Sequence, residues 1–132
     1  MRQWSDDYTI GIEGIDRQHR MLFTLGNDLQ TALDEGRAAQ EYGVLLKSLD
    51  LYVQYHFGFE DRCMQQYHCP VAQQNRDAHT AFAARLAEFT QSYAAHRFNH
   101  VEACTLMTMI DEWLTEHICG IDMQLKTSVR TP

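Results

Sequence analysis

Six residues have the types and the spacing of metal ligands on packed helices: His19, His56, Glu60, His79, His117 and Asp122. His56 and Glu60 are four residues apart, and on a helix this spacing leaves an angle of only ~40° between them. An imidazole and a carboxylate can then reach one common position, as the di-iron sites of helical bundles require. His117 and Asp122 form a second pair of this kind. The pattern predicts a metal centre that several helices share.

The residue types in this pattern favour iron. Imidazole suits iron of either oxidation state, and a carboxylate can bridge two cations and offset part of their charge. Two bridging carboxylates with terminal histidines hold two irons close together and leave positions for an exogenous ligand. A single histidine–carboxylate pair on a helix is more often a surface pair or a hydrogen-bonded histidine. The prediction of a metal centre therefore depends on the whole set, in which every predicted helix supplies a candidate ligand that faces the interior of the bundle.

The other histidines are interpreted as solvated side chains. His68 lies in a predicted loop, and His96 and His100 lie at a polar junction before the last predicted helix. The four cysteines form no CxxC pair, and we expect them to be buried thiols: Cys63, Cys69, Cys104 and Cys119. A zinc site made by Cys63, His68 and Cys69 is the alternative, but its spacing matches no common zinc motif.

The apolar spacing predicts four helices that position the candidate ligands, at about residues 16–36, 40–67, 70–93 and 99–127. Asp16 is the expected N-cap of the first helix and Gly36 its C-cap. Pro70 has the place of a first-turn proline, and Asn99 with Glu102 resembles a capping box. The residues before Asp16 lack helical periodicity and are expected to form an irregular arm. Short loops between such helices predict an all-α fold, an antiparallel up-down four-helix bundle.

The last predicted helix has one irregular feature. His117 and Asp122 are five residues apart, which in a regular helix separates them by about 140°. Either the side chains diverge from a regular helix to reach one metal pair, or a π-bulge narrows the angle, with Gly120 easing the distortion. We expect a regular helix here.

The composition limits the possible partners and location. The 132 residues suffice for one domain, residues 1–132, with a single core. The formal net charge of -7 argues against nucleic acid and against anionic membranes as partners. The chain start has no apolar stretch of signal-peptide length, and no run could span a bilayer. A cytoplasmic protein is therefore expected.

The motifs around the candidate ligands resemble those of the hemerythrin family, specifically bacterial hemerythrin domains. The family's IDxQH is similar to IDRQH, which ends at His19. Its HFxxExxxM is similar to HFGFEDRCM, which contains His56 and Glu60, and its WLxxHIxxxD is similar to WLTEHICGID, which contains His117 and Asp122. The resemblance covers nearly the whole chain. It implies two non-haem iron ions that Glu60, Asp122 and an oxo or hydroxo group bridge.

The resemblance also implies different roles for the two irons. His19 and His56 are expected to serve the iron that binds dioxygen, and His79 and His117 the other iron, which takes three histidines in the family. The family's third-helix motif is HxxxH, but here Asn75 stands four residues before His79. An amide oxygen is a neutral and weaker ligand than imidazole. We expect water or an exogenous ligand there, hydrogen-bonded to Asn75, with weak coordination by Asn75 as the alternative.

Three functions are compatible with this pattern. The favoured hypothesis is a dioxygen-binding or redox-sensing module. The resemblance implies a fused output domain such as a diguanylate cyclase, as bacterial hemerythrin domains often have. The second is stand-alone dioxygen storage or delivery, and the third is an oxidase or peroxidase, for which no substrate-cleft signature is visible. Aromatic residues one turn from the candidate ligands favour a dry pocket: Phe23, Tyr52, Phe82 and Trp113. Trp113, part of the family motif, is the expected pocket wall.

Overall fold

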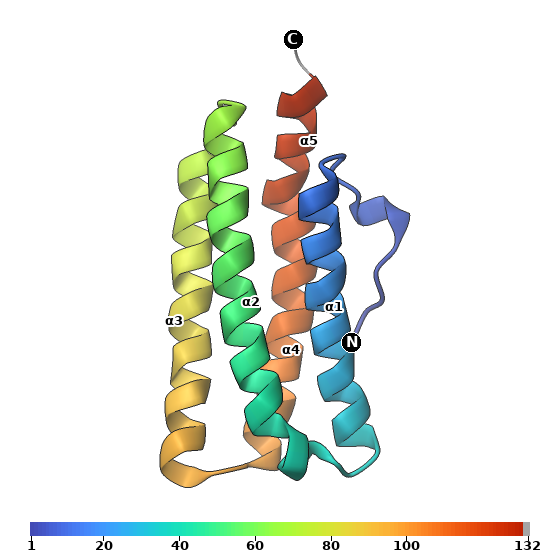
Figure 1. Ribbon diagram of the computed structural model, residues 1–132, viewed down its shortest axis with the longest axis vertical. Coiled ribbons are helices and arrows are strands. Elements are labelled where there is room, and N and C mark those ends of the chain that lie inside the picture. The colour runs from blue at the N-terminus through green and yellow to red at the C-terminus, as the bar shows by residue number, and fades with distance from the viewer. Residues whose placement is uncertain (131–132) are drawn as a thin grey trace.

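The computed structural model describes residues 1–130 and consists of long helices (Figure 1). The helices are α1 (Glu13–Asp34), α2 (Ala38–Gln66), α3 (Ala72–His96), α4 (His100–His117) and α5 (Met123–Arg130). A short π-helix, η2 (Ile118–Asp122), joins α4 to α5, so that these three elements form one continuous rod. No strand is present within residues 1–130. The prediction of an all-α, up-down four-helix bundle is confirmed.

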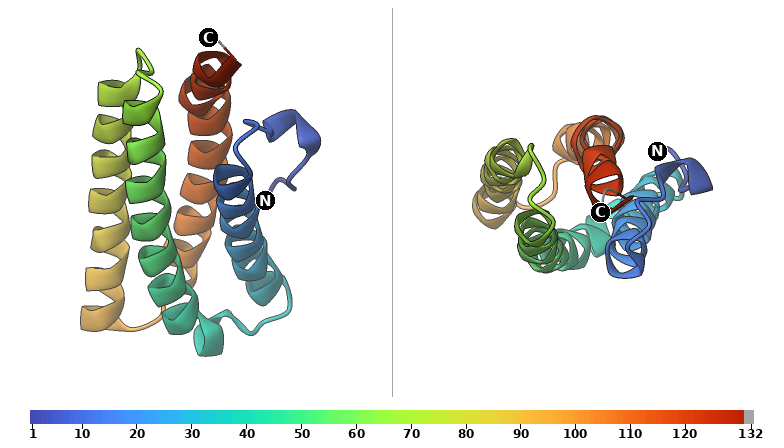
Figure 2. Two further views of the ribbon diagram at one scale, coloured as in Figure 1. Left: turned by 45° about the horizontal axis from the view of Figure 1, so that its top comes forward. Right: turned by 90° about the horizontal axis from the view of Figure 1, so that it is seen from above.

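The helices surround one common core. α1 packs against α2 and α4, and α3 closes the ring by packing against α2 and α4; the view along the bundle shows these four rods around a centre (Figure 2). An N-terminal arm with one 3-10 turn, η1 (Asp6–Tyr8), lies outside the ring beside α1. None of the helices within residues 1–130 is long and apolar enough to cross a membrane.

The predicted end of the first helix and start of the fourth are confirmed, and the start of the third is shifted. Gly36, which follows the C-cap Glu35 of α1, has a φ of +72°, the left-handed conformation that ends helices. The Asn99 side chain accepts a hydrogen bond from the Glu102 N–H (3.0 Å) and so caps α4. Pro70 does not lie in the first turn of α3, which begins at Ala72. The proline instead occupies the turn before α3, which the Ala72 N–H closes by donating to the Cys69 carbonyl (3.1 Å).

The predicted role of Asp16 as an N-cap is wrong. α1 begins three residues earlier, at Glu13, and Asp16 is buried inside its first turns. Its carboxylate accepts hydrogen bonds from the N–H groups of Ile10 (2.7 Å) and Gly11 (3.2 Å). Asp16 therefore fastens the arm to the bundle from within the helix. The arm is fixed further along where Trp4 and Tyr8 pack around the ring of Phe23.

The expectation of a regular fourth helix is also wrong. Between His117 and Asp122 the backbone forms the π-helix η2, and the Met123 N–H donates to the carbonyl of Ile118, five residues earlier. A π-turn takes more residues per turn than an α-turn, which brings residues five apart onto nearly the same side of the helix. The widened turn is therefore the feature that lets both side chains face the centre of the bundle.

The buried apolar residues form two clusters. The larger one fills most of the bundle and includes Leu22, Val53 and Leu114. The smaller one lies near α5 and contains Ile10, Ile15, Met64, Cys69 and Leu125. On α1, α2 and α4–α5 alike, the candidate ligands lie between residues of these two clusters. The polar centre is thus a layer with apolar packing on both sides along the bundle axis.

Replacement of Asp16 tests the attachment of the arm. We expect Asp16→Ala to lower the free energy of unfolding by about 2–3 kcal/mol, because the buried Ile10 N–H loses its charged acceptor. Urea unfolding measures this change, and amide hydrogen exchange at residues 10–11 should accelerate. Glu13→Ala is the matched control, since the Glu13 side chain is 81% exposed. An Asp16→Ala protein as stable as the Glu13→Ala control would contradict the assignment.

Candidate metal centre

The six predicted ligands come together at the centre of the bundle, where Glu60 lies between the four histidines. Its side chain is fully buried. The Oε2 atom lies 3.1 Å from Nε2 of His19 and 3.4 Å from Nε2 of His56. The Oε1 atom lies 3.1 Å from Nε2 of His79 and 3.7 Å from Nε2 of His117. Each oxygen of this carboxylate therefore faces one pair of histidines, drawn from two different helices.

Asp122 repeats this arrangement from the opposite side. Its Oδ2 atom lies 3.1 Å from Nε2 of His19, and its Oδ1 atom lies 3.1 Å from Nε2 of His117. Asp122 is also fully buried, and its position follows from the π-helix, of which it is the last residue. Two carboxylates thus join the same two histidine pairs, as bridging ligands of a dinuclear centre do.

The geometry divides the ligands into two groups that share Glu60. One group is His19, His56, Glu60 and Asp122, and the other is Glu60, His79 and His117; within each group one ligand atom per residue lies within 4.8 Å of all others. Buried oxygens here lack hydrogen-bond partners within the described chain: Oε1 of Glu60 and both carboxylate oxygens of Asp122. Unpaired buried carboxylate oxygens are costly. Cations between them would satisfy these atoms, so the donor set fits two metal ions.

In the metal-free protein, protons take the place of cations. Burial lowers the pKa of the His19 imidazole, but the Asp122 and Glu60 carboxylates, each 3.1 Å from its Nε2 atom, outweigh burial and raise that pKa to about 10. The same two carboxylates raise the pKa of His117 to about 9 against the effect of burial. Burial alone would raise the pKa of Glu60, yet the facing imidazoles, His56 first, hold it well below its usual range. Protonated histidines therefore neutralise the carboxylates until metal displaces the protons.

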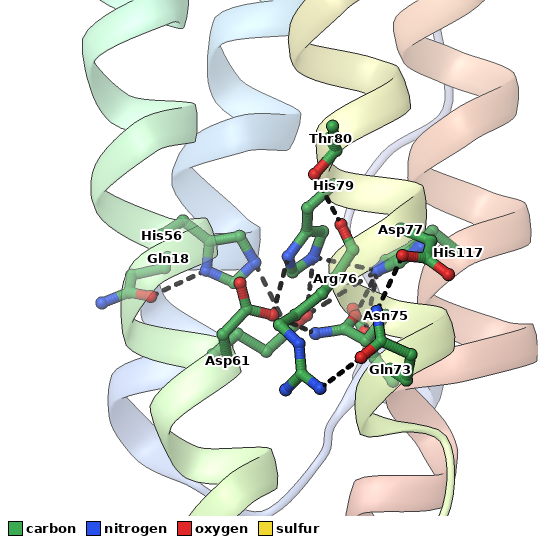
Figure 3. A network of polar contacts seen from close by, with 12 residues as sticks. Gln18, His56, Asp61, Gln73, Asn75, Arg76, Asp77, His79, Thr80 and His117 are labelled. Carbon is green, nitrogen blue, oxygen red and sulfur yellow. Dashed lines mark hydrogen bonds and ion pairs between the residues drawn. The ribbon is translucent and has the colours of Figure 1, made fainter.

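Two polar residues that the sequence analysis did not single out orient the histidine rings (Figure 3). The Nδ1–H of His56 donates to Oε1 of Gln18 (2.7 Å), and the Nδ1–H of His79 donates to Oδ1 of Asp61 (3.1 Å). An acceptor at Nδ1 leaves Nε2 free to bind metal. In the sequence, both residues could have been found by their position next to a candidate ligand: Gln18 precedes His19, and Asp61 follows Glu60.

Aromatic rings cover the side of the centre that His79 and His117 form. Trp113, the expected pocket wall, stacks on His117 with ring centroids 4.2 Å apart. Phe57, which the sequence analysis did not single out, stacks on His79 at 3.8 Å, and Phe82 contacts Trp113 at 4.4 Å. The other two predicted pocket aromatics lie elsewhere. Phe23 packs under the arm, and half-buried Tyr52 has Tyr55 as its ring partner.

Asn75 lies inside this centre, and its exposure is 0%. Its Oδ1 atom is 2.8 Å from Nε2 of His117, and its Nδ2 atom donates to Oδ1 of Asp61 (2.8 Å). The structure thus brings the amide next to the ligand atoms of the second group, where the sequence analysis expects it.

The remaining histidines and cysteines stay outside the centre. His68, His96 and His100 are exposed, as expected. The predicted zinc alternative does not form, since no group of three candidate ligands within residues 1–130 includes Cys63, His68 or Cys69. All four cysteines are free. The expectation that they are buried holds for Cys69, whereas Cys63 and Cys104 are only half-buried. It is wrong for exposed Cys119, because position 119 lies on the outer side of η2.

The raised histidine pKa values predict how the metal-free protein responds to pH. The folded-state pKa values of about 10 and about 9 exceed the unfolded value of 6.5, so protonation stabilises the fold and this stabilisation is lost as the pH rises through 9 to 10. Urea unfolding with chelator present should show the free energy of unfolding falling from about pH 6.5 to 10. We expect His19→Gln to flatten this decline and His68→Gln, an exposed control, to keep it. A rise over that range would contradict the charge assignment.

Comparison with known proteins agrees with this geometry. Residues 10–128 match the family model described as the hemerythrin HHE cation binding domain. The chain is similar to a bacteriohemerythrin of Stenotrophomonas maltophilia (strain R551-3), with 32% identity over 96% of this chain and 80% of the relative. It is also similar to bacteriohemerythrins of Pseudomonas aeruginosa (strain LESB58), with 27% identity over 96% and 80%, and of Clostridium acetobutylicum, with 22% identity over 92% and 95%. The chain belongs to the hemerythrin family of cation-binding domains.

Proposed function

We propose that this protein is a di-iron domain that binds dioxygen and reports its oxidation state to a partner. The observation that carries the proposal is the pair of buried carboxylates, Glu60 and Asp122, each with one oxygen toward each histidine pair. Hemerythrin domains bind a di-iron centre and dioxygen, and the family match extends that expectation to this chain. The proposed ligands are His19, His56, Glu60, His79, His117 and Asp122.

When bound, two irons would supply the electrons and the binding position for dioxygen. The chain supplies the surroundings. Glu60 and Asp122 offset the charge of the two cations, and Gln18 and Asp61 hold the tautomers of His56 and His79. Trp113 and Phe57 stack on the imidazoles of His117 and His79 and keep water from that side of the centre.

Asn75 favours sensing over storage. A storage protein needs a reduced centre that oxidises slowly. Asn75 supplies a neutral amide where the family resemblance leads us to expect a third imidazole, and a neutral oxygen is a weaker and more easily displaced donor. Such a donor gives up its coordination position to an exogenous ligand more readily, which should speed the oxidation of the centre.

The π-helix supports a route from the metal centre to a partner. Asp122 ends η2, and α5 begins at the next residue. Leu125 of α5 is buried against Ile10, Ile15 and Met64. A shift of Asp122 on oxidation would therefore move α5 against the arm and the end of α2, through packed rather than flexible contacts. An output domain such as a diguanylate cyclase is the kind of partner that we propose for this end of the bundle.

Stand-alone dioxygen storage or delivery is the second candidate. The aromatic cover over His79 and His117 favours it, because a dry centre loses bound ligand less readily to protonation and hydrolysis. The two candidates differ in how long the reduced protein survives in the presence of dioxygen.

Stopped-flow mixing of the diferrous protein with dioxygen separates the two candidates. We expect metal analysis to give two irons per chain, and the absorption of the diferric form to develop within seconds of mixing. Hydrogen exchange should then differ between the diferrous and diferric proteins at residues 118–130 and not at the exposed loop around His68. A spectrum that stays distinct from the diferric form for many minutes would support storage instead. A protein that takes up no iron, or a single zinc, would refute both candidates.

A further inference from the structure

The amide of Asn75 has one defined orientation. Its Nδ2 atom is 2.8 Å from Oδ1 of Asp61, and a carboxylate oxygen can only accept a hydrogen bond. The NH2 group must therefore face Asp61, and the opposite orientation would set two oxygens against each other. The Oδ1 atom of Asn75 consequently faces Nε2 of His117, 2.8 Å away.

This orientation leaves the Asn75 oxygen without a donor once metal binds. In the metal-free protein, the Nε2–H of His117 can donate to it. When Nε2 of His117 binds a metal ion, that hydrogen is absent, and Asn75 Oδ1 has no other hydrogen-bond donor within the described chain. A fully buried amide oxygen without a partner is unfavourable. A cation or a water molecule must then satisfy it.

The distances favour the cation. Two donor atoms that bind one metal ion at about 2.1 Å and at right angles to each other are about 3 Å apart. Nε2 of His117 and Nε2 of His79 are 3.1 Å apart, and Nε2 of His117 and Oδ1 of Asn75 are 2.8 Å apart. These separations are those of neighbouring ligands in one coordination sphere. A water molecule between the metal and Asn75 would require the amide oxygen to lie farther from the histidine nitrogens.

We infer that Oδ1 of Asn75 is itself a metal ligand beside His79 and His117, and that Asp61 is the positioning residue that aims it. This inference rests on the proposed di-metal function and deepens it, because it assigns the second site two imidazole nitrogens and otherwise oxygen donors. Asp61 acts on two ligands at once, since the same Oδ1 atom accepts hydrogen bonds from Asn75 and from His79. The second site is therefore richer in hard oxygen donors than a three-histidine site.

Cobalt titration of the metal-free protein under nitrogen tests this inference without any oxygen chemistry. We expect calorimetry and the visible absorption of Co²⁺ to show two ions per wild-type chain. Asn75→Ala should weaken one of the two sites by at least tenfold and leave the other unchanged. Asn75→His should keep both sites and change the absorption of one, because imidazole is a stronger-field ligand than an amide oxygen.

Asp61 variants test the positioning role. Asp61→Ala should weaken the same site as Asn75→Ala does, and Asp61→Asn should restore part of the loss, because an amide oxygen can still accept from both donors but carries no charge. Asp77→Ala is the matched control, since Asp77 is an exposed carboxylate on α3 whose partner is the exposed Gln73. We expect this control to bind both ions as the wild type does.

A crystal structure of the cobalt-loaded wild type decides between the amide and water even if Asn75→Ala fails to fold. The inference requires Asn75 Oδ1 at bonding distance from the metal, about 2.1 Å. A water molecule between the two, or unchanged affinities in the Asn75→Ala and Asp61→Ala proteins, would overturn it while leaving the di-metal function intact. A wild type that binds fewer than two ions would instead refute the proposed function.

Discussion

A carboxylate between packed helices needs hydrogen-bond donors or positive charge facing it, because desolvating one ion costs several kcal/mol. Asp16 has backbone N–H donors, whereas Glu60 and Asp122, which are fully buried, lie in a layer between two apolar clusters. Within residues 1–130 the ion-pair partners of both are histidines alone. Imidazoles can meet this need in two ways: they carry a proton when metal is absent, and they share a cation with the carboxylates when it is present. The same side-chain positions therefore serve both states of the protein.

The need to place Glu60 and Asp122 beside the same histidines affects the backbone as well as the side chains. α1, α2 and α3 each bring their ligands to the centre from regular helical turns. The fourth rod has to bring two ligands from one narrow stretch, and it does so by widening its turn at η2. Gly120 lies within that turn, yet a Cβ at this position would meet no atom within 4 Å. Packing therefore does not require a glycine in the widened turn, whose effect is to let Asp122 face the centre.

The fold and the grouping of the six candidate ligands at one centre were predictable from the sequence because both depend on spacing along a helix. The features that the prediction missed depend on contacts between segments. Asp16 has the residue type of an N-cap, but the arm folds back over it and supplies Ile10 and Gly11 as its donors. Asp61 looks like an ordinary surface acid beside a ligand until α3 packs against α2 and brings His79 and Asn75 to it. The five-residue spacing of His117 and Asp122 fits both a π-turn and divergent side chains on a regular helix, so spacing alone does not identify the π-turn.

The two histidine pairs are alike in number but not in their surroundings. His56 is backed by the neutral amide of Gln18, and Nδ1 of His19 has no hydrogen-bond partner within the described chain. His79 is backed by the Asp61 carboxylate, and a carboxylate behind a ligating imidazole makes it a stronger donor. The side of the centre that holds Asn75 in place of an imidazole therefore has the better-donating histidine. It also carries the ring stacking of Phe57 and Trp113, which keeps water away from it. The stronger donation of His79 thus compensates in part for the weaker donation of the Asn75 amide. The main remaining consequence of Asn75 is that an exogenous ligand can displace its oxygen more easily than it could displace an imidazole.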